Sequence, residues 1–261
     1  MNILFVADVF GRPGRQVVKN RLPELKTELA IDVCIANCEN SASGLGITEK
    51  TADELFNAGI DVLTGGNHLW DKKEVLDYLA IENRILKPAN YPPKALGSQY
   101  FIKTLPNDQK LAIITLCGQA FMSPANSPLL VMEEMLPILK EQSDFIFVDF
   151  HAEATAEKRA FGLYFDGQIS AVVGTHTHVQ TADEEILPGG TAYITDAGMT
   201  GPHYSVIGMK KEIIFEKMIT GMPFKYEVAD RGKQLNAVFI SVDEKTGKAT
   251  KIERIREKIS D

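Results

Sequence analysis

His176 and His178, two positions apart, are the residues whose type and spacing indicate chemistry most directly. They follow the apolar, β-branched run 170–173, so they stand where a predicted strand gives way to a loop. On a straight strand their side chains would point to opposite faces, whereas on a turning loop they can converge on one ligand. Imidazole is the commonest metal ligand, so the pair predicts a metal site, with two ordinary polar loop residues as the alternative.

The same arrangement, an apolar strand that ends in a residue able to bind a metal, recurs along the chain. The residues in these positions are Asp8, Glu39, Asn40, Asn67, His68, His151, His176 and His178. Binding sites gather at the carboxyl ends of strands in α/β sheets, so we expect these side chains to meet. Polar residues also follow strands simply because the chain has reached solvent. The repetition from a narrow set of residue types nevertheless favours one shared metal site.

The ligand types in this set are carboxylate oxygen, amide oxygen and imidazole nitrogen. Such a mixture suits transition metals such as iron, manganese or zinc better than calcium. The candidates are too many for one four-coordinate ion, and two ions bridged by a carboxylate fit better. A pair of metals about 3.5–4 Å apart is a known clamp for phosphoryl displacement. Glu39 is the natural bridge because a carboxylate has two oxygens.

The elements that must position these residues alternate between strands and helices over the first 80 residues. We predict strands at 3–7, 33–36 and 60–64, a turn at 11–15, and helices ending near 29 and covering 48–57 and 72–79. Thr48 is the predicted N-cap of the second helix. This alternation is typical of a mostly parallel sheet covered by helices.

The segments after residue 98 predict hairpins in addition to alternating strands and helices. Residues 99–105 and 110–117 predict a hairpin, as do 235–242 and 249–256, and strands are expected at 144–150, 171–174 and 191–195. Helices are expected at 129–140, 155–164 and 211–220. No linker divides the chain, so we expect residues 1–261 to form a single domain with two stacked sheets.

Composition limits the function further. The 261 residues are 44% hydrophobic and 24% charged, which is ordinary for a soluble globular protein. The net charge of −7 leaves no strong nucleic-acid footprint, and an anionic substrate would need a local positive centre such as a bound cation. Three cysteines argue against a disulfide framework. Without a signal peptide or a run of about 20 apolar residues, we expect a cytoplasmic protein without a membrane partner.

Several motifs in combination resemble a known family. Residues Gly65-Gly66-Asn67-His68, His151 and 174–178 resemble the calcineurin-type binuclear metallophosphoesterases, and segments 8–11, 37–41, 149–155 and 195–202 resemble their YmdB-like branch. The resemblance implies a four-layer α-β-β-α sandwich in which two mixed sheets are flanked by helices. Two positions depart from the wider superfamily, which usually has a histidine where this chain has Phe10 and an aspartate where it has Glu39.

The resemblance also implies how the site is divided. One metal would be held by Asp8, Glu39, Asn40 and His178, and the other by Glu39, Asn67, His151 and His176. A metal-bound hydroxide would be the nucleophile, with His68 as general acid. The two ions would be divalent or mixed-valence transition metals, with iron favoured and manganese or zinc as alternatives.

The expected function is therefore a metal-dependent phosphodiesterase for small phosphodiesters, with 2′,3′-cyclic nucleotides as the favoured substrates. The alternatives are a regulatory protein that binds a nucleotide or a partner with incidental turnover, and a phosphomonoesterase. A homo-oligomer is expected. His203 is a candidate substrate contact or a turn residue, His68 could instead brace Asn67, Asp8 could cap the next turn, and Asn40 could hold the loop 41–46.

Overall fold

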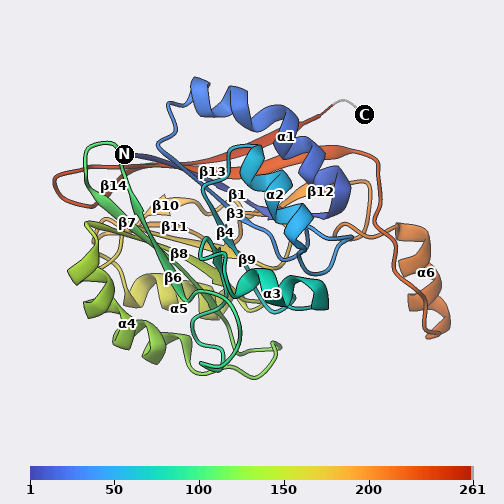
Figure 1. Ribbon diagram of the computed structural model, residues 1–261. Helices are drawn as coiled ribbons and strands as arrows, with labels where there is room; N and C mark the ends of the chain where they lie inside the picture. Colours follow the sequence, from blue (N-terminus) through green and yellow to red (C-terminus); the bar gives the residue numbers. More distant parts are fainter. Residues whose placement is uncertain (260–261) are drawn as a thin grey trace.

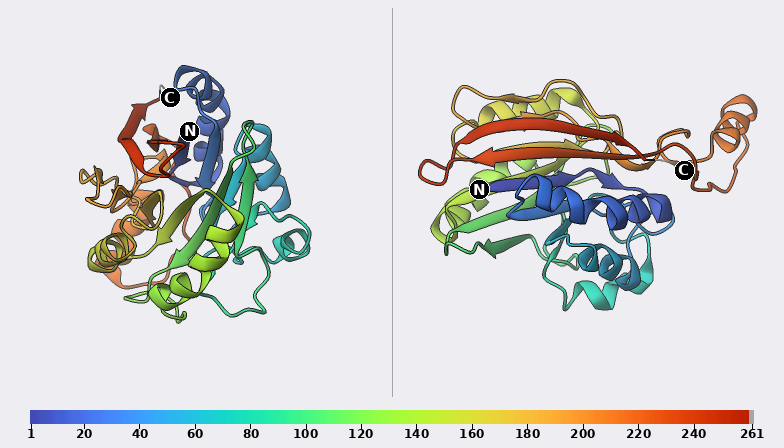
Figure 2. Two further views of the ribbon diagram at one scale, coloured as in Figure 1. Left: turned by 90° about the vertical axis from the view of Figure 1, so that its left-hand side faces the viewer. Right: turned by 90° about the horizontal axis from the view of Figure 1, so that it is seen from above.

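The computed structural model describes residues 1–259 and contains two β-sheets face to face, with helices on both outer sides (Figure 1, Figure 2). Both sheets combine parallel and antiparallel pairs, so both are mixed. The predicted four-layer α-β-β-α sandwich is therefore confirmed. Among the described residues, no helix has the length and apolar character needed to cross a membrane.

The first sheet is built mainly from the two ends of the chain. Its strands in spatial order are β2 (Asp8–Val9), β12 (Met199–Pro202), β13 (Lys233–Val242), β1 (Asn2–Val6), β3 (Val33–Asn37), β4 (Val62–Thr64) and β5 (Ile85–Leu86), with β14 (Ala249–Lys258) paired to β13. The neighbours β1, β3, β4 and β5 run parallel. Their carboxyl ends therefore lie along one edge of the sheet.

The second sheet is built from the middle of the chain. Its strands in spatial order are β10 (Glu185–Ile186), β11 (Ala192–Ile194), β9 (Ala171–Thr175), β8 (Phe145–His151), β7 (Lys110–Cys117) and β6 (Tyr100–Thr104). The strands β7, β8, β9 and β11 are parallel, whereas β6 pairs antiparallel with β7 as the predicted hairpin. This sheet too has a row of parallel strands that end at a common edge.

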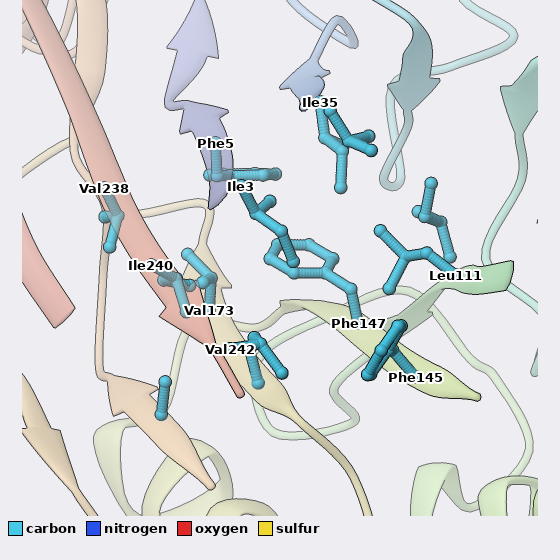
Figure 3. Packing of buried hydrophobic residues seen from close by; sticks show 14 of the residues in the cluster. Ile3, Phe5, Ile35, Leu111, Phe145, Phe147, Val173, Val238, Ile240 and Val242 are labelled. Carbon is cyan, nitrogen blue, oxygen red and sulfur yellow. The ribbon is translucent and has the colours of Figure 1, made fainter. Parts of the chain in front are cut away.

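The core between the sheets follows from strand alternation, because successive side chains point to opposite faces. In β1, Ile3 and Phe5 face the second sheet, whereas Leu4 and Val6 pack under helices. Figure 3 shows the inter-sheet cluster, in which Phe5 stacks on Phe147 with ring centroids 5.5 Å apart. The two sheets are thus joined by one continuous apolar layer.

Helices cover the two outer faces. On the first sheet lie α1 (Gly11–Glu28), α2 (Glu49–Asn57), the short 3₁₀ helix η1 (Lys73–Val75) and α3 (Leu76–Leu79), and on the second lie α4 (Pro128–Gln142) and α5 (Thr155–Tyr164). Thr48 caps α2 as predicted: its Oγ1 accepts from the Thr51 backbone, and the Thr51 side chain accepts from the Thr48 backbone. This capping box satisfies two backbone groups that a helix end would otherwise leave unpaired.

The structure corrects some local predictions. Residues 11–15, predicted as a turn, form the first turn of α1, and the helix predicted at 72–79 divides into η1 and α3. The helix predicted at 211–220 is confirmed as α6 (Lys211–Thr220), but it has no buried residue and projects from the sandwich (Figure 1, Figure 2).

Candidate metal centre

The candidate ligands come from both sheets and meet at the edge where the parallel strands end. Glu39 follows β3 in the first sheet, and His151 closes β8 in the second. Their side chains nevertheless touch, with Glu39 Oε1 3.0 Å from His151 Nε2. Strand direction thus converts distant sequence positions into one site, as the sequence predicts.

Three side chains, from Glu39, Asn67 and His176, converge on His151 Nε2. Asn67 Oδ1 lies 3.1 Å from this nitrogen, and His176 Nδ1 lies 3.0 Å from it. Ligand atoms of Glu39, His151 and His176 all lie within 4.8 Å of one another, and Glu39 and His151 are buried. A carboxylate, an amide oxygen and two imidazoles directed at one small volume form a donor set that suits a transition-metal ion.

The other nitrogen of His151 is held by a buried hydrogen-bond chain. His151 Nδ1 lies 2.9 Å from Thr175 Oγ1, and that hydroxyl donates to Asp149 Oδ1 at 2.6 Å. Because the Thr175 hydroxyl donates to Asp149, it must accept from Nδ1–H. The arrangement leaves Nε2 to face Glu39, and such support is typical of histidines that bind metals. Asp149 thus orients His151 through the Thr175 hydroxyl.

Glu39 and His151 shift each other's pKa values, and His151 also shifts that of His176. Burial lowers the pKa of His151, but the charge and hydrogen bond of Glu39 outweigh this and raise it to about 9. Burial raises the pKa of Glu39, and His151 more than reverses this, giving about 2. Burial and the charge on His151 lower the pKa of His176 to about 4. In the chain alone, protonated His151 therefore supplies the positive charge that stabilises the ionised Glu39 carboxylate.

A second group of candidates lies at the start of the chain and after β9. Asp8 Oδ2 is 3.2 Å from His178 Nε2, yet within residues 1–259 neither oxygen of the buried Asp8 carboxylate receives a hydrogen bond of normal geometry. Asp8 does not cap α1, whose N-cap is Phe10 and has no side-chain cap. Phe10 instead packs its ring edge against His178, at 5.5 Å between centroids.

Asn40, like Asp8, has a buried side-chain oxygen, Oδ1, that no hydrogen bond satisfies within residues 1–259. Its backbone carbonyl, by contrast, accepts from the backbone N–H groups of Gly11 and Gly44. The backbone of Asn40, and not its side chain, therefore holds the loop. Buried polar atoms are almost always paired, so three unpaired oxygens on Asp8 and Asn40 fit a cation site.

The loop that carries the two histidines turns sharply, as convergence requires. His176 and His178 have φ angles of 100° and 64°, which are uncommon for residues with a side chain. The turn directs His176 to His151 and His178 to Asp8. Gly66 makes room beside them, because a Cβ there would lie 2.4 Å from both Glu39 Oε2 and His151 Nε2. The residues present thus fit metal binding by donor type, by unpaired oxygens and by available space.

His68 stands beside this centre. Its backbone N–H donates to Glu39 Oε2 at 3.0 Å, and its Nδ1 lies 2.8 Å from Asp71 Oδ2. An ionised carboxylate only accepts, so Nδ1–H donates to Asp71. The side chain is 35% exposed, so a small molecule can reach it. Among residues 1–259, the His68 side chain pairs with Asp71 and forms no hydrogen bond to the Asn67 side chain.

Comparison with known proteins places the chain in a family. The sequence model of one family, described as "YmdB-like protein", matches residues 4–255. The chain belongs to the YmdB-like family. The family resemblance predicted from the motifs is confirmed.

Two relatives extend this result. A Bacillus subtilis protein named 2′,3′-cyclic-nucleotide 2′-phosphodiesterase is 47% identical over 98% of this chain and 96% of its own length. A Mycoplasma genitalium protein named putative phosphatase/phosphodiesterase is 37% identical over 98% of this chain and 92% of its own. Both names describe hydrolases of phosphoester bonds.

Two solved structures confirm the fold of this YmdB-like protein. A Thermus thermophilus protein described as hypothetical superposes with a TM-score of 0.93 at 36% identity, covering 99% of both chains. A Mycoplasma pneumoniae protein described as a novel phosphatase also gives 0.93 at 38% identity, covering 99% of this chain and 93% of its own.

The structure also locates residues that sequence reasoning did not single out. Glu153 Oε2 lies 3.3 Å from His176 Nε2, and Asp71 supports His68. Glu153 follows His151 by two residues and Asp71 follows His68 by three, but acidic residues in loops are ordinarily solvated, so the sequence alone did not mark them. His203 donates from Nε2 to the Met199 carbonyl at 2.8 Å, and its contact with substrate stays a prediction.

Proposed function

We propose that this YmdB-like protein is a metal-dependent phosphodiesterase that hydrolyses small phosphodiesters, with 2′,3′-cyclic nucleotides as the favoured substrates. The observation that carries the proposal is the convergence of Glu39, His151 and His176, with ligand atoms within 4.8 Å of one another. The name and 47% identity of the Bacillus subtilis relative support the substrate class.

Two metal ions would share the site. Asp8, Glu39, Asn40 and His178 would hold one, and Glu39, Asn67, His151 and His176 the other, with iron favoured over manganese or zinc. When bound, such ions polarise a phosphoryl oxygen and lower the pKa of water towards neutrality. The buried oxygens of Asp8 and Asn40 that lack hydrogen bonds support the first group.

His68 would act as the general acid. Its Nδ1–H is held by Asp71 at 2.8 Å, which fixes the orientation of the ring. The Nε2 atom has no hydrogen-bond partner among residues 1–259, so it is the nitrogen that can deliver a proton to the leaving oxygen. His68 directly follows Asn67, a proposed metal ligand, so the chain holds the proton donor next to the metal site.

Two substitutions test these roles. His68→Ala should lower turnover of a 2′,3′-cyclic nucleotide by about 10²- to 10⁴-fold, the usual contribution of general acid catalysis, with metal content retained. Glu39→Gln should abolish turnover and reduce metal content, because a charged ligand is lost. Turnover by wild-type, His68→Ala and Glu39→Gln proteins should be measured together with metal analysis. Full activity in both variants would reject the assigned roles.

A phosphomonoesterase is the second candidate, since the Mycoplasma genitalium relative carries both activities in its name. Turnover of mono- and diester p-nitrophenyl phosphates separates the two, and the phosphodiesterase proposal expects the diester to be preferred. A regulatory binding protein would instead bind a cyclic nucleotide tightly without hydrolysing it.

We also propose a homo-oligomer, supported by the arm formed by residues 211–227. The helix α6 within it exposes Phe215, Met218 and Ile219, with exposed fractions of 51%, 79% and 83%. A ten-residue helix is marginal in water without packing, so the arm needs a partner surface. The arm carries three lysines and three glutamates, so two copies of the acidic chain can meet there without like-charge repulsion.

Light scattering tests this assembly. Met218→Glu combined with Ile219→Glu should reduce the measured mass to that of a monomer, because both side chains are exposed on the arm. Ile81→Glu is the matched control, since Ile81 is 82% exposed but lies on the sandwich. A monomeric wild-type protein would reject the proposed assembly.

The remaining expectations also stand as proposals. The apolar layer shared by the two sheets supports a single domain for residues 1–261. The three cysteines are buried free thiols, which supports the proposed cytoplasmic location.

A further inference from the structure

A buried ion pair lies beside the two-histidine loop but contains none of the proposed ligands. Lys158 of α5 and Asp196, which follows β11, are 2.7 Å apart, with exposed fractions of 1% and 0%. Removing two charges from water is costly, and apolar side chains of similar volume often stabilise a protein as well. The pair therefore calls for a role other than general stability.

The carboxylate of Asp196 is bonded to the residue between the two histidines. Its Oδ2 accepts from the Thr177 backbone N–H at 3.0 Å and from the Thr177 hydroxyl at 2.8 Å, in addition to Lys158. Its Oδ1 accepts from the Gly198 N–H at 2.8 Å. Both oxygens thus accept hydrogen bonds, and Thr177 donates two of them to the same carboxylate oxygen.

The backbone of Asp196 holds the other end of the same loop. Its N–H donates to Thr181 Oγ1 at 2.9 Å, and its carbonyl accepts from the Thr181 N–H at 3.0 Å. Residue 196 therefore clamps the loop at positions 177 and 181, on either side of His178. The carboxylate cannot shift without moving a backbone that is itself fixed.

The clamp acts on a strained segment. The positive φ angles of His176 and His178 cost free energy and persist only where the surroundings impose them. Close packing supports the same geometry, because a Cβ at Gly174 would lie 1.8 Å from the Thr195 carbonyl oxygen and 3.0 Å from Lys158 Cδ. The stem of Lys158 thus packs against the strand that leads into the loop.

We propose that Asp196, fixed by Lys158, is a positioning residue that holds the 176–178 turn in the conformation in which His176 and His178 face the two metal sites. This inference rests on the proposed function, since it assigns a role toward the metals. Lys158 balances the buried charge and fixes the carboxylate, and Asp196 transmits that position through Thr177. Neither residue touches the substrate.

The test compares two double variants that both remove the charges, so neither leaves an unpaired buried ion. Lys158→Met with Asp196→Leu removes the acceptors for Thr177, whereas Lys158→Met with Asp196→Asn keeps one side-chain oxygen. Calorimetric titration of the metal-free full chain with Mn²⁺ is the readout. We expect the leucine variant to lose about 10- to 100-fold in affinity, as other residues that orient metal ligands do, and the asparagine variant to stay close to wild type.

Wild-type affinity in a folded leucine variant would overturn the positioning role, and so would an equal loss in both variants. A cooperative thermal melt establishes folding. Should the leucine variant not fold, Thr177→Val takes its place, because it removes only the 2.8 Å hydroxyl bond, and unchanged affinity there overturns the role. Failure of the wild type to bind Mn²⁺ would instead contradict the proposed function.

Discussion

Single residues at the proposed metal centre are distinguished by the atoms that the rest of the protein leaves unbonded. Asp8 and Asn40 present buried oxygens that have no hydrogen-bond partner among residues 1–259, although nearly all other buried polar groups described there are paired. In Asn40 the backbone and the side chain have different roles. The backbone carbonyl fixes the loop, and the side-chain oxygen stays available to bind a cation. A bound cation is the partner that such oxygens accept most readily.

Gly66 offers a test at this scale. In Gly66→Ala the new methyl would lie 2.3 Å from His151 Cδ2 and 2.4 Å from Glu39 Oε2. Both side chains must therefore move away from the methyl and out of their positions at the site. A misplacement of about 1 Å in an active site can lower the rate of turnover about 100-fold. We expect a loss of that size in Gly66→Ala, together with weaker Mn²⁺ binding. Ile81→Ala is the control, because Ile81 is 82% exposed and is not among the proposed ligands. Unchanged turnover in Gly66→Ala would show that the site lies elsewhere.

The candidate ligands themselves could be named from sequence because each follows an apolar strand. Their supporting residues could not. Asp71, Glu153 and Asp196 are acidic residues in loops, and in a sequence they look like ordinary solvated side chains. Only the folded chain shows that Asp71 bonds His68 and that Asp196 bonds Thr177.

At the scale of elements, the loops that present ligands are fixed by the helices that follow them. The loop after Asn40 leads into α2, whose first turn is closed by the Thr48–Thr51 capping box. Strands and helices with clear periodicity were predictable, and α5 and α6 match their predicted bounds. The strands β2, β5, β10 and β12 have two to four residues each, too few to show a pattern, so the sequence did not predict them.

Thr48→Ala tests the contribution of the cap. It removes the side-chain oxygen that accepts from Thr51 N, and loss of an N-cap costs about 1 kcal/mol. We expect the free energy of unfolding in urea to fall by that amount, with Thr48→Ser close to wild type because it keeps the hydroxyl. Equal stability of the alanine and serine variants would contradict the assigned role.

At the scale of the whole molecule, the proposed metal centre depends on the packing of the two sheets against each other. Glu39 follows a strand of one sheet and His151 ends a strand of the other, and the inter-sheet layer around Phe5 and Phe147 sets the distance between these strands (Figure 3). The sequence predicted two stacked sheets and a family with this architecture. It could not show which faces of the strands meet, because strands buried on both sides have no polar face to mark the outside.

Phe147→Ala tests this layer. Removal of a fully buried phenylalanine leaves a cavity and costs about 3–5 kcal/mol. We expect a loss of that size in chemical denaturation. The matched control is Phe121→Ala, which should change stability little because Phe121 is 93% exposed. Similar stabilities for the two variants would mean that the sheets are joined by other contacts.

The most direct test of the central claim is anomalous X-ray diffraction from crystals of the Mn²⁺-loaded protein. The proposed site predicts two anomalous peaks at the edge where the strands of both sheets end, one between Asp8 and His178, the other between His151 and His176, with Glu39 contacting both. Peaks located away from these residues, or none despite saturating Mn²⁺, would contradict it.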